Sequence, residues 1–131
     1  MGANGFMAKM TNCIFCNPDR ALLAETDLSL AFFDAFPISQ GHTLVIPKRH
    51  IETIWDMTNE EYADAFDLIR QMKGVLQSKF DPHGFNIGAN CGEAAGQTLF
   101  HAHIHLIPRY YGDVPDPSGG VRNLIPDKGK Y

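Results

Sequence analysis

The chain has 131 residues, of which 44% are hydrophobic and 20% are charged, and its formal net charge at pH 7 is −4. These values are typical of one globular domain that is long enough to bury a core without disulfides. No apolar run approaches the roughly 20 residues needed to cross a bilayer, and the acidic balance disfavours nucleic-acid binding, which requires a basic face. We therefore expect neither a membrane nor a nucleic acid as a partner.

The N-terminal region carries no recognisable sorting signal. Residues 1–11 lack the basic, apolar and cleavage regions that a secretory signal combines. The chain has three cysteines, an odd number, which together with the missing signal favours a reducing compartment. We therefore expect a cytoplasmic protein in which residues 1–11 are a flexible segment and residues 12–131 form one domain.

The first half of the chain is expected to form three short strands. A turn at residues 17–19 precedes two apolar runs, residues 22–25 and 30–33, which are spaced as a hairpin. A loop then leads to residues 43–46, a β-rich run that Pro47 ends.

One long helix is predicted to follow. Thr58 is followed three residues later by Glu61, which is the capping-box pattern of a helix start. Apolar residues then recur at steps of three or four, as in an amphipathic helix that packs on a sheet. These residues are Tyr62, Phe66, Ile69, Met72, Leu76 and Phe80. Helix-breaking residues at 81–84 end the helix.

Two further strands are expected in the second half. Residues 85–90 form one of them, and residues 99–108 form a long final strand that Pro108 ends. Residues 111–131 are rich in glycine, proline and aspartate and are expected to wrap the surface. Five strands with one major helix between the third and the fourth indicate an α+β fold with an antiparallel sheet.

Three histidines gather in the final predicted strand. They are His101, His103 and His105, half of the six histidines in the chain, and they alternate with aliphatic residues. Because alternate side chains of a strand share a face, the imidazoles would line one face at steps of about 6.6 Å while the aliphatic side chains point into a core. Such a row is typical of a metal site, a proton relay or a phosphate site.

A loop with two glycines lies directly before the histidines. Gly92 and Gly96 allow the backbone to approach a ligand closely, and exposed N–H groups in such a loop bind anionic oxygens. Gln97 and Thr98 add polar groups. Together with the three histidines, this loop favours a phosphate site.

Two of the cysteines are spaced as in metal or redox sites. Cys13 and Cys16 have C-x2-C spacing, which alone is ambiguous between zinc and redox chemistry. They lie at a loop start rather than at a βαβ turn, which disfavours a thioredoxin-like function. Cys91 stands apart in the sequence and is expected to be a small packed residue.

The chain resembles the histidine triad (HIT) family over roughly residues 13–109. The resemblance is carried by residues 31–34, residues 41–50, Asn90, Gly92, residues 95–98 and residues 101–108. The tail segments 112–115 and 119–122 look like a bacterial branch described as dinucleoside polyphosphate hydrolase-like. The resemblance implies a HIT-like α+β fold, with a five-stranded antiparallel sheet, one long helix and one short helix.

The resemblance also implies catalytic roles for the histidines. His103, in the middle, takes the position of a nucleophile that attacks the α-phosphorus of a nucleotide. A covalent nucleotidyl-imidazole intermediate forms, and water then hydrolyses it. His105 matches the histidine that contacts the phosphate, and His101 completes the catalytic set.

Substrate-binding positions follow from the same resemblance. The phosphate-binding positions are Asn90, Gln97 and Thr98. Asp34 matches the position that binds the ribose hydroxyls, for which a carboxylate acceptor is suited. Phe32, with Ile14 and Leu44 nearby, would flank the base, although each of these apolar residues fits a plain sheet core equally well.

Some branches of the family, and the related galactose-1-phosphate uridylyltransferases, hold zinc with a C-x2-C pair and two histidines. This sequence keeps all four positions, namely Cys13, Cys16, His50 and His101. The resemblance therefore implies a structural Zn²⁺ that ties the N-terminal segment to the sheet without activating water, and no organic cofactor. The alternative is an empty site in which the two histidines form hydrogen bonds near the triad.

Three functions remain open. The first is hydrolysis or transfer at nucleoside 5′-phosphoryl substrates, such as Ap4A or nucleoside phosphoramidates. The second is a purine-nucleotide-binding regulatory module with little turnover, which would not need a central nucleophile. The third is a zinc-holding interaction domain, which leaves His103 and His105 without a role. We therefore predict a HIT-type nucleotide hydrolase. The resemblance also implies a homodimer with twofold symmetry, which is the default form of a symmetric oligomer.

Overall fold

The computed structural model describes residues 12–131, so the predictions for residues 1–11 lie outside it. Its strands are β1 (Ala24–Glu25), β2 (Ser29–Phe33), β3 (Thr43–Pro47), β4 (Gly84–Gly88) and β5 (Ile104–Arg109). Its helices are the long α2 (Asn59–Phe80) and the short 3-10 helices η1 (Ile54–Asp56), η2 (Glu93–Ala95) and η3 (Gly120–Leu124). None of the helices in residues 12–131 combines the length and apolar character that a membrane crossing requires.

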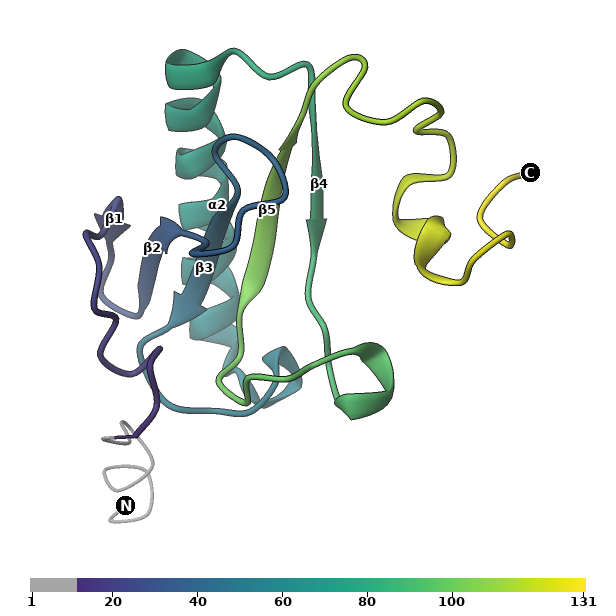
Figure 1. The fold of residues 1–131 in the computed structure, drawn as a ribbon. Helices are drawn as coiled ribbons and strands as arrows, with labels where there is room; N and C mark the ends of the chain where they lie inside the picture. Colours follow the sequence, from purple (N-terminus) through teal and green to yellow (C-terminus); the bar gives the residue numbers. More distant parts are fainter. Residues whose placement is uncertain (1–11) are drawn as a thin grey trace.

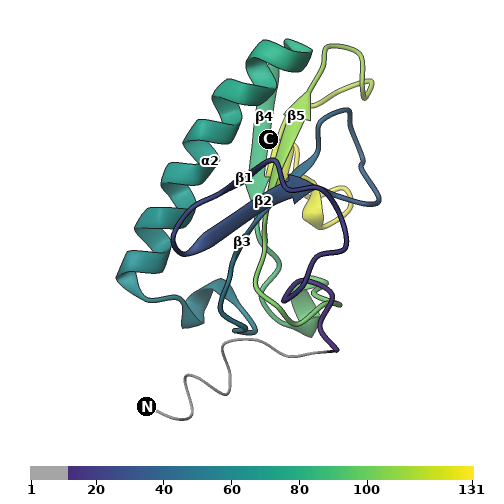
Figure 2. The ribbon, with the colours of Figure 1, turned by 90° about the vertical axis from the view of Figure 1, so that its left-hand side faces the viewer.

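The five strands form one antiparallel sheet in the order β1-β2-β3-β5-β4. Helix α2 runs across one face of this sheet, as the two ribbon views show (Figures 1 and 2). The chain passes through α2 from β3 to the far edge of the sheet at β4, and β5 then returns between them. The predicted α+β fold with a five-stranded antiparallel sheet and one long helix is confirmed. The short helical segments in the described residues are 3-10 turns.

The sheet separates two apolar clusters. The cluster under α2 receives Ala31, Val45, Ile104 and Leu106 from the sheet. The cluster on the opposite face contains Phe15, Leu30, Phe32, Leu44 and Ile46. Neighbouring residues of each strand thus divide between the two faces, as the pleat of a strand requires. The face away from α2 is the one on which side chains of the strands remain available for a site.

Helix α2 begins as the sequence predicts. The Thr58 hydroxyl accepts from the N–H of Glu61 at 3.1 Å, and the Glu61 carboxylate accepts from the N–H of Thr58 at 2.9 Å, which confirms the capping box. The buried side chains of the helix are Glu61, Ala65, Leu68, Ile69, Met72 and Leu76. Phe66, predicted to lie in the core, is 45% exposed. It follows the buried Ala65 by one residue, a rotation of about 100° around the helix axis.

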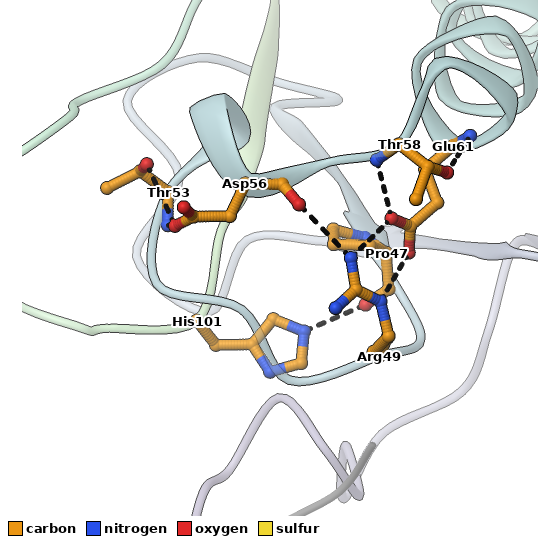
Figure 3. Close-up of polar contacts among 7 residues, drawn as sticks. All are labelled: Pro47, Arg49, Thr53, Asp56, Thr58, Glu61 and His101. Atoms are coloured by element: carbon orange, nitrogen blue, oxygen red, sulfur yellow. Dashed lines mark hydrogen bonds and ion pairs between the residues drawn. The ribbon is translucent and has the colours of Figure 1, made fainter. Parts of the chain in front are cut away.

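An ion pair joins the start of α2 to the segment after β3. Arg49 donates to both carboxylate oxygens of Glu61 at 3.2 and 2.7 Å (Figure 3). Burial alone would raise the pKa of Glu61, but the hydrogen bonds from Arg49 and Thr58 hold that pKa below its ordinary value. Figure 3 also shows the carbonyl of Pro47, at the end of β3, accepting from Nε2–H of His101 at 2.8 Å. The same segment therefore positions both the helix and His101.

Candidate active site

The three histidines lie at the start of β5 rather than along it. The sequence predicts a strand over residues 99–108, but β5 begins at Ile104, so only His105 is a strand residue. The pairing of β5 with β3 ends at Ile104, and the N–H of Ala102 instead donates to the carbonyl of Ile51 at 2.7 Å. The predicted alternation still holds, because the aliphatic residues between the histidines are buried in the cluster under α2.

A cavity of about 610 Å³ lies beside these histidines on the face of the sheet away from α2. Its volume is within the range of pockets that hold small organic ligands. The predicted site residues that line it are Asp34, Asn90, Gln97, Thr98, His103 and His105, with Ile14 and Leu44 on its apolar side. His101 and Phe32 are fully buried and are not among its lining residues. The structure therefore brings most of the predicted residues to one cavity.

The main chain orients His103. Its Nδ1–H donates to the carbonyl of His101 at 2.8 Å. Because a neutral imidazole carries one proton, this hydrogen bond leaves the lone pair on Nε2. The rings of Phe15 and His105 pack edge-on against the His103 ring, with centroid distances of 5.2 and 5.3 Å. The contacts hold the ring in one orientation at the cavity wall.

His105 is the end of a chain of hydrogen bonds. The N–H of Ile38 donates to Nδ1 of His42 at 3.2 Å, so a neutral His42 carries its proton on Nε2. This Nε2–H donates to Nδ1 of His105 at 2.9 Å, which leaves the His105 proton on Nε2. Asp34 Oδ2 lies 3.5 Å from Nε2 of His42 and 3.9 Å from Nδ1 of His105. The chain therefore makes His105 a hydrogen-bond donor through Nε2.

Burial keeps both histidines of this chain neutral at pH 7. It lowers the pKa of His105 to about 4, with His103 and His42 adding to the effect and Asp34 opposing it. It also lowers the pKa of His42 against the opposing charge of Asp34. The 2.9 Å between the two imidazole nitrogens fits a hydrogen bond. Two nitrogens bound to one tetrahedral zinc would be about 3.3 Å apart, so the distance between His42 and His105 fits a hydrogen bond rather than a shared metal.

The sequence pattern predicts no role for His42. The signal that points to it is positional: His42 lies two residues before Leu44 and therefore on the same side of β3, and the register partner of Leu44 is His105. Arg20 was also missed. Its guanidinium donates to the carbonyl of Phe33 at 3.2 Å, and the residue lines the cavity, where it brings a positive charge.

Gln97 ties the glycine loop together instead of offering its amide to a ligand. Its Oε1 accepts from the N–H of Gly92 at 2.8 Å, and its Nε2 donates to the carbonyls of Glu52 and Leu99 at 2.6 and 3.1 Å. Both amide hydrogens are therefore engaged. Gly92 has a φ of 96°, a conformation that favours glycine. The contribution of Gln97 is to hold the loop in place.

Phe32 supports the cavity from behind its wall. Its ring packs edge-on against that of Phe15 at 5.4 Å, and the guanidinium of Arg20 lies 5.1 Å from its centroid. Phe15 and Arg20 both line the cavity, whereas Phe32 has no exposed surface. Phe32 therefore does not line the cavity as predicted, but it contacts two residues that do.

The four predicted metal ligands converge at one place. The ligand atoms of Cys13, Cys16, His50 and His101 all lie within 4.8 Å of one another. The Cys16 sulfur is 3.3 Å from Nδ1 of His50 and 3.5 Å from Nδ1 of His101, and the Cys13 sulfur is 3.5 Å from the latter. A tetrahedral zinc with ordinary Zn–S and Zn–N bonds separates sulfur from nitrogen by about 3.6 Å. The donor set and its spacing therefore fit zinc, which thiolate and imidazole ligands suit.

The second nitrogen of His101 has the partner that a metal-bound histidine requires. Its Nε2–H donates to the carbonyl of Pro47, which directs Nδ1 toward the two sulfurs. Burial lowers the pKa of His101 to about 4; the Pro47 hydrogen bond opposes this shift, and His50 and His103 add to it. The ring is therefore neutral at pH 7, which is the protonation state of a ligand.

A family model matches most of the chain. The model of the HIT domain matches residues 17–112, which include the glycine loop and all three histidines. The chain belongs to the HIT family. A HIT relative from Bacillus subtilis named Protein hit is 41% identical over 104 residues, covering 76% of this chain and 72% of that protein.

Two HIT relatives from Schizosaccharomyces pombe carry enzyme names. An adenosine 5′-monophosphoramidase is 38% identical over 103 residues, covering 75% of this chain and 74% of that protein. An asymmetrical bis(5′-nucleosyl)-tetraphosphatase is 42% identical over 89 residues, covering 68% of this chain and 49% of that protein. The family to which this chain belongs thus includes proteins named as hydrolases of nucleotide derivatives.

Solved HIT structures share this fold. A HIT family protein from Bacillus anthracis has a TM-score of 0.74 at 41% identity, covering 79% of this chain and 77% of that one. A Zn-bound histidine triad family protein from Mycobacterium smegmatis has a TM-score of 0.70 at 33% identity, covering 86% of this chain and 90% of that one.

Proposed function

We propose that this HIT protein hydrolyses or transfers nucleotides at the α-phosphorus of nucleoside 5′-phosphoryl substrates, with His103 as the nucleophile. One observation carries the proposal: two neighbouring imidazoles at one cavity have complementary protonation. The Nε2 of His103 bears a lone pair because Nδ1–H is held by the His101 carbonyl. The Nε2 of His105 bears a proton because Nδ1 accepts from His42. Displacement at phosphorus requires a nucleophile that attacks the phosphorus atom and a hydrogen-bond donor that stabilises the charge on the phosphate oxygens.

The chemistry proceeds in two displacements at phosphorus. The lone pair of His103 Nε2 forms a bond to phosphorus while the bond to the leaving group breaks and its electron pair departs with that group. The His101 carbonyl stabilises the positive charge that the ring gains, and His105 donates to a phosphate oxygen. Water, or another acceptor, then attacks phosphorus and loses a proton to solvent, the N–P bond breaks, and its electron pair returns to Nε2.

Other lining residues have binding roles in this proposal. Asp34 accepts from the ribose hydroxyls through the oxygen that faces His42, while its Oδ1 accepts from the N–H of Phe36 at 2.9 Å. Asn90 and Thr98 donate to phosphate oxygens. Ile14 and Leu44 flank a purine base on the apolar side of the cavity.

Zinc has a structural place in the proposal. Cys13, Cys16, His50 and His101 would hold it, and the Zn-bound relative from Mycobacterium smegmatis supports this. When bound, the ion supplies a crosslink between the N-terminal segment and the sheet, with no open position for catalysis.

We also infer that residues 12–131 act as one HIT domain in a twofold homodimer in the cytoplasm. Within the described residues β4 is an edge strand of the sheet, and Phe66 and Val75 of α2 are 45% and 48% exposed. An unpaired strand edge and exposed apolar side chains support an isologous interface through α2 and β4. The net charge of −4 supports a small nucleotide rather than a nucleic acid as the ligand.

A turnover panel separates this function from a purine-nucleotide-binding module. The zinc-loaded protein would be incubated with Ap4A, adenosine 5′-phosphoramidate and adenylyl sulfate, and the release of AMP or ATP would be followed by chromatography. The proposal expects multiple turnovers of at least one substrate. Tight binding of AMP without turnover of any of the three would favour the regulatory module.

The assignment of Asp34 predicts a ribose-dependent loss of affinity. Asp34→Asn keeps an acceptor for the N–H of Phe36 but loses the charged acceptor for the hydroxyls, so AMP binding should weaken by about tenfold or more. Titration calorimetry should show that 2′,3′-dideoxy-AMP binds the unaltered protein weakly and is insensitive to the substitution. Asp67→Asn on the exposed side of α2 is the matched control. Equal affinity of the unaltered protein for AMP and its dideoxy analogue would contradict the assignment.

A further inference from the structure

We propose that the cluster of Cys13, Cys16, His50 and His101 is coupled to the nucleotide cavity, so that zinc at the cluster tightens nucleotide binding and bound nucleotide slows the loss of zinc. The proposal rests on the proposed function in one respect, which is that the cavity takes a nucleotide. Two connections between the cluster and the cavity carry it.

The first connection is the pair of residues between the cysteines. The N–H of Cys16 donates to the carbonyl of Cys13 at 3.2 Å, which closes a turn that contains Ile14 and Phe15. Both of these residues line the cavity. The segment belongs to no strand or helix. The thiols at its two ends contact the histidines of the cluster. A metal that fixes both cysteines therefore fixes this part of the cavity wall.

Phe15 extends this connection to the nucleophile. Its side chain is 6% exposed, and its ring meets the His103 ring edge-on at 5.2 Å and the His101 ring at 6.1 Å. Ile14, by contrast, is 58% exposed and faces the open cavity. A change in the position of the C-x2-C turn would therefore move both an apolar contact for the ligand and a neighbour of the catalytic ring.

The second connection runs through the two ends of His101. Its ring contributes Nδ1 to the cluster and donates Nε2–H to the carbonyl of Pro47. Its main-chain carbonyl accepts Nδ1–H of His103 at 2.8 Å. His101 precedes β5. The peptide group that carries its carbonyl is held from one side by the hydrogen bond of the Ala102 N–H to Ile51, and the anchorage of the His101 ring adds a second restraint on that carbonyl. In this account, Ile14, Phe15 and His101 are positioning residues that act on the ligand and on His103.

Linkage makes the coupling reciprocal, which allows a test without turnover. If zinc tightens AMP binding by some factor, AMP must tighten zinc binding by the same factor. The rate of zinc transfer from the zinc-loaded protein to a chromogenic chelator would be measured with and without saturating AMP. Saturation would be verified by calorimetry. At equilibrium with the chelator we expect AMP to tighten zinc binding by about tenfold, within the usual range of allosteric coupling, and the transfer of zinc should be slower in its presence.

Two variants separate this coupling from a general stabilisation of the fold. Ile14→Ala alters the wall between the cysteines, whereas Ile38→Ala alters the same cavity from the loop between β2 and β3. Both side chains are exposed, at 58% and 75%, so neither change removes a core residue. At saturating AMP, Ile38→Ala should retain the slowing of zinc transfer, and Ile14→Ala should lose most of it.

The connection through His101 has a spectroscopic readout. In the zinc-loaded protein the ¹⁵N shifts of His103 should report a single tautomer protonated at Nδ1. After zinc removal, the same signals should report a mixture of both tautomers, and reloading with zinc should restore the single form. An unchanged tautomer on zinc removal would overturn this connection.

The remaining outcomes distinguish the inference from the function on which it rests. Equal slowing in the Ile14 and Ile38 variants would overturn the connection through the C-x2-C turn. Equal rates of zinc transfer with and without bound AMP would overturn the coupling and leave the proposed enzyme intact. Failure of the protein to take up zinc would do the same. Absence of AMP binding by the zinc-loaded protein would overturn the coupling and the proposed function together.

Discussion

Replacing His103 with alanine should abolish turnover while leaving nucleotide binding nearly intact. The substitution removes the atom that bonds to phosphorus, so the rate with any substrate that the unaltered protein turns over should fall by about 1,000-fold or more. AMP affinity should change by less than about tenfold, because the lost interaction forms in the transition state. Turnover assays and calorimetry on the same preparations measure both quantities.

Two further variants serve as comparisons for His103→Ala. His83→Ala makes the same chemical change at an exposed histidine that stacks on Tyr111 outside the cavity, and it should retain full activity. His105→Ala removes a donor to the phosphate and should reduce both affinity and rate. Near-full activity of His103→Ala would refute the mechanism and would leave direct attack by water as the alternative.

Loss of zinc from the four-residue cluster should lower the stability of the fold strongly. Metal analysis of protein purified without added zinc should give about one zinc per chain. Cys16→Ser should remove most of that zinc and lower the melting temperature by roughly 10 °C or more, because a structural metal contributes its binding energy to folding. Cys16 is 2% exposed and contacts both histidines of the cluster, so its sulfur is central to the site.

The third cysteine provides the matched control for this prediction. Cys91 lies outside the four-residue cluster, so Cys91→Ser should keep its zinc and melt within a few degrees of the unaltered protein. Removal of zinc from the unaltered protein with a chelator should reproduce the melting temperature of Cys16→Ser. A metal-free protein that melts at the same temperature as the zinc-loaded one would refute a structural role for the cluster.

The features that sequence reasoning predicted well depend on local periodicity. The capping box at Thr58 and Glu61 is a contact between residues three apart, and residues 101–106 alternate between imidazoles and buried aliphatic side chains as an extended chain requires. Such features are set by near neighbours in the chain. The C-x2-C spacing points to a metal or redox site, but the complete set of four ligands was found by resemblance to a family, since the distance of the two histidines from the cysteines in the sequence carries no geometric information.

The features that sequence reasoning missed depend on contacts between distant segments. His42 reaches His105 across the pairing of β3 with β5, and the amide of Gln97 is engaged by Glu52, far away in the chain. β5 starts only at Ile104, although its partner β3 continues to Pro47, and the N–H of Ala102 donates to the distant Ile51 carbonyl instead. A pattern of residue types cannot show which polar group will find which partner, so it cannot distinguish a residue that meets a ligand from one that holds a loop.

The most direct test of the account is to trap the covalent intermediate. Zinc-loaded protein would be mixed with a substrate labelled at its α-phosphate, quenched with base within milliseconds to seconds, digested, and mapped by mass spectrometry. A nucleotidyl group is expected on the peptide that contains His103, and it should be stable to base, labile to acid and absent from His103→Ala. Rapid turnover with no labelled protein at any quench time, or a label on a different residue, would contradict it.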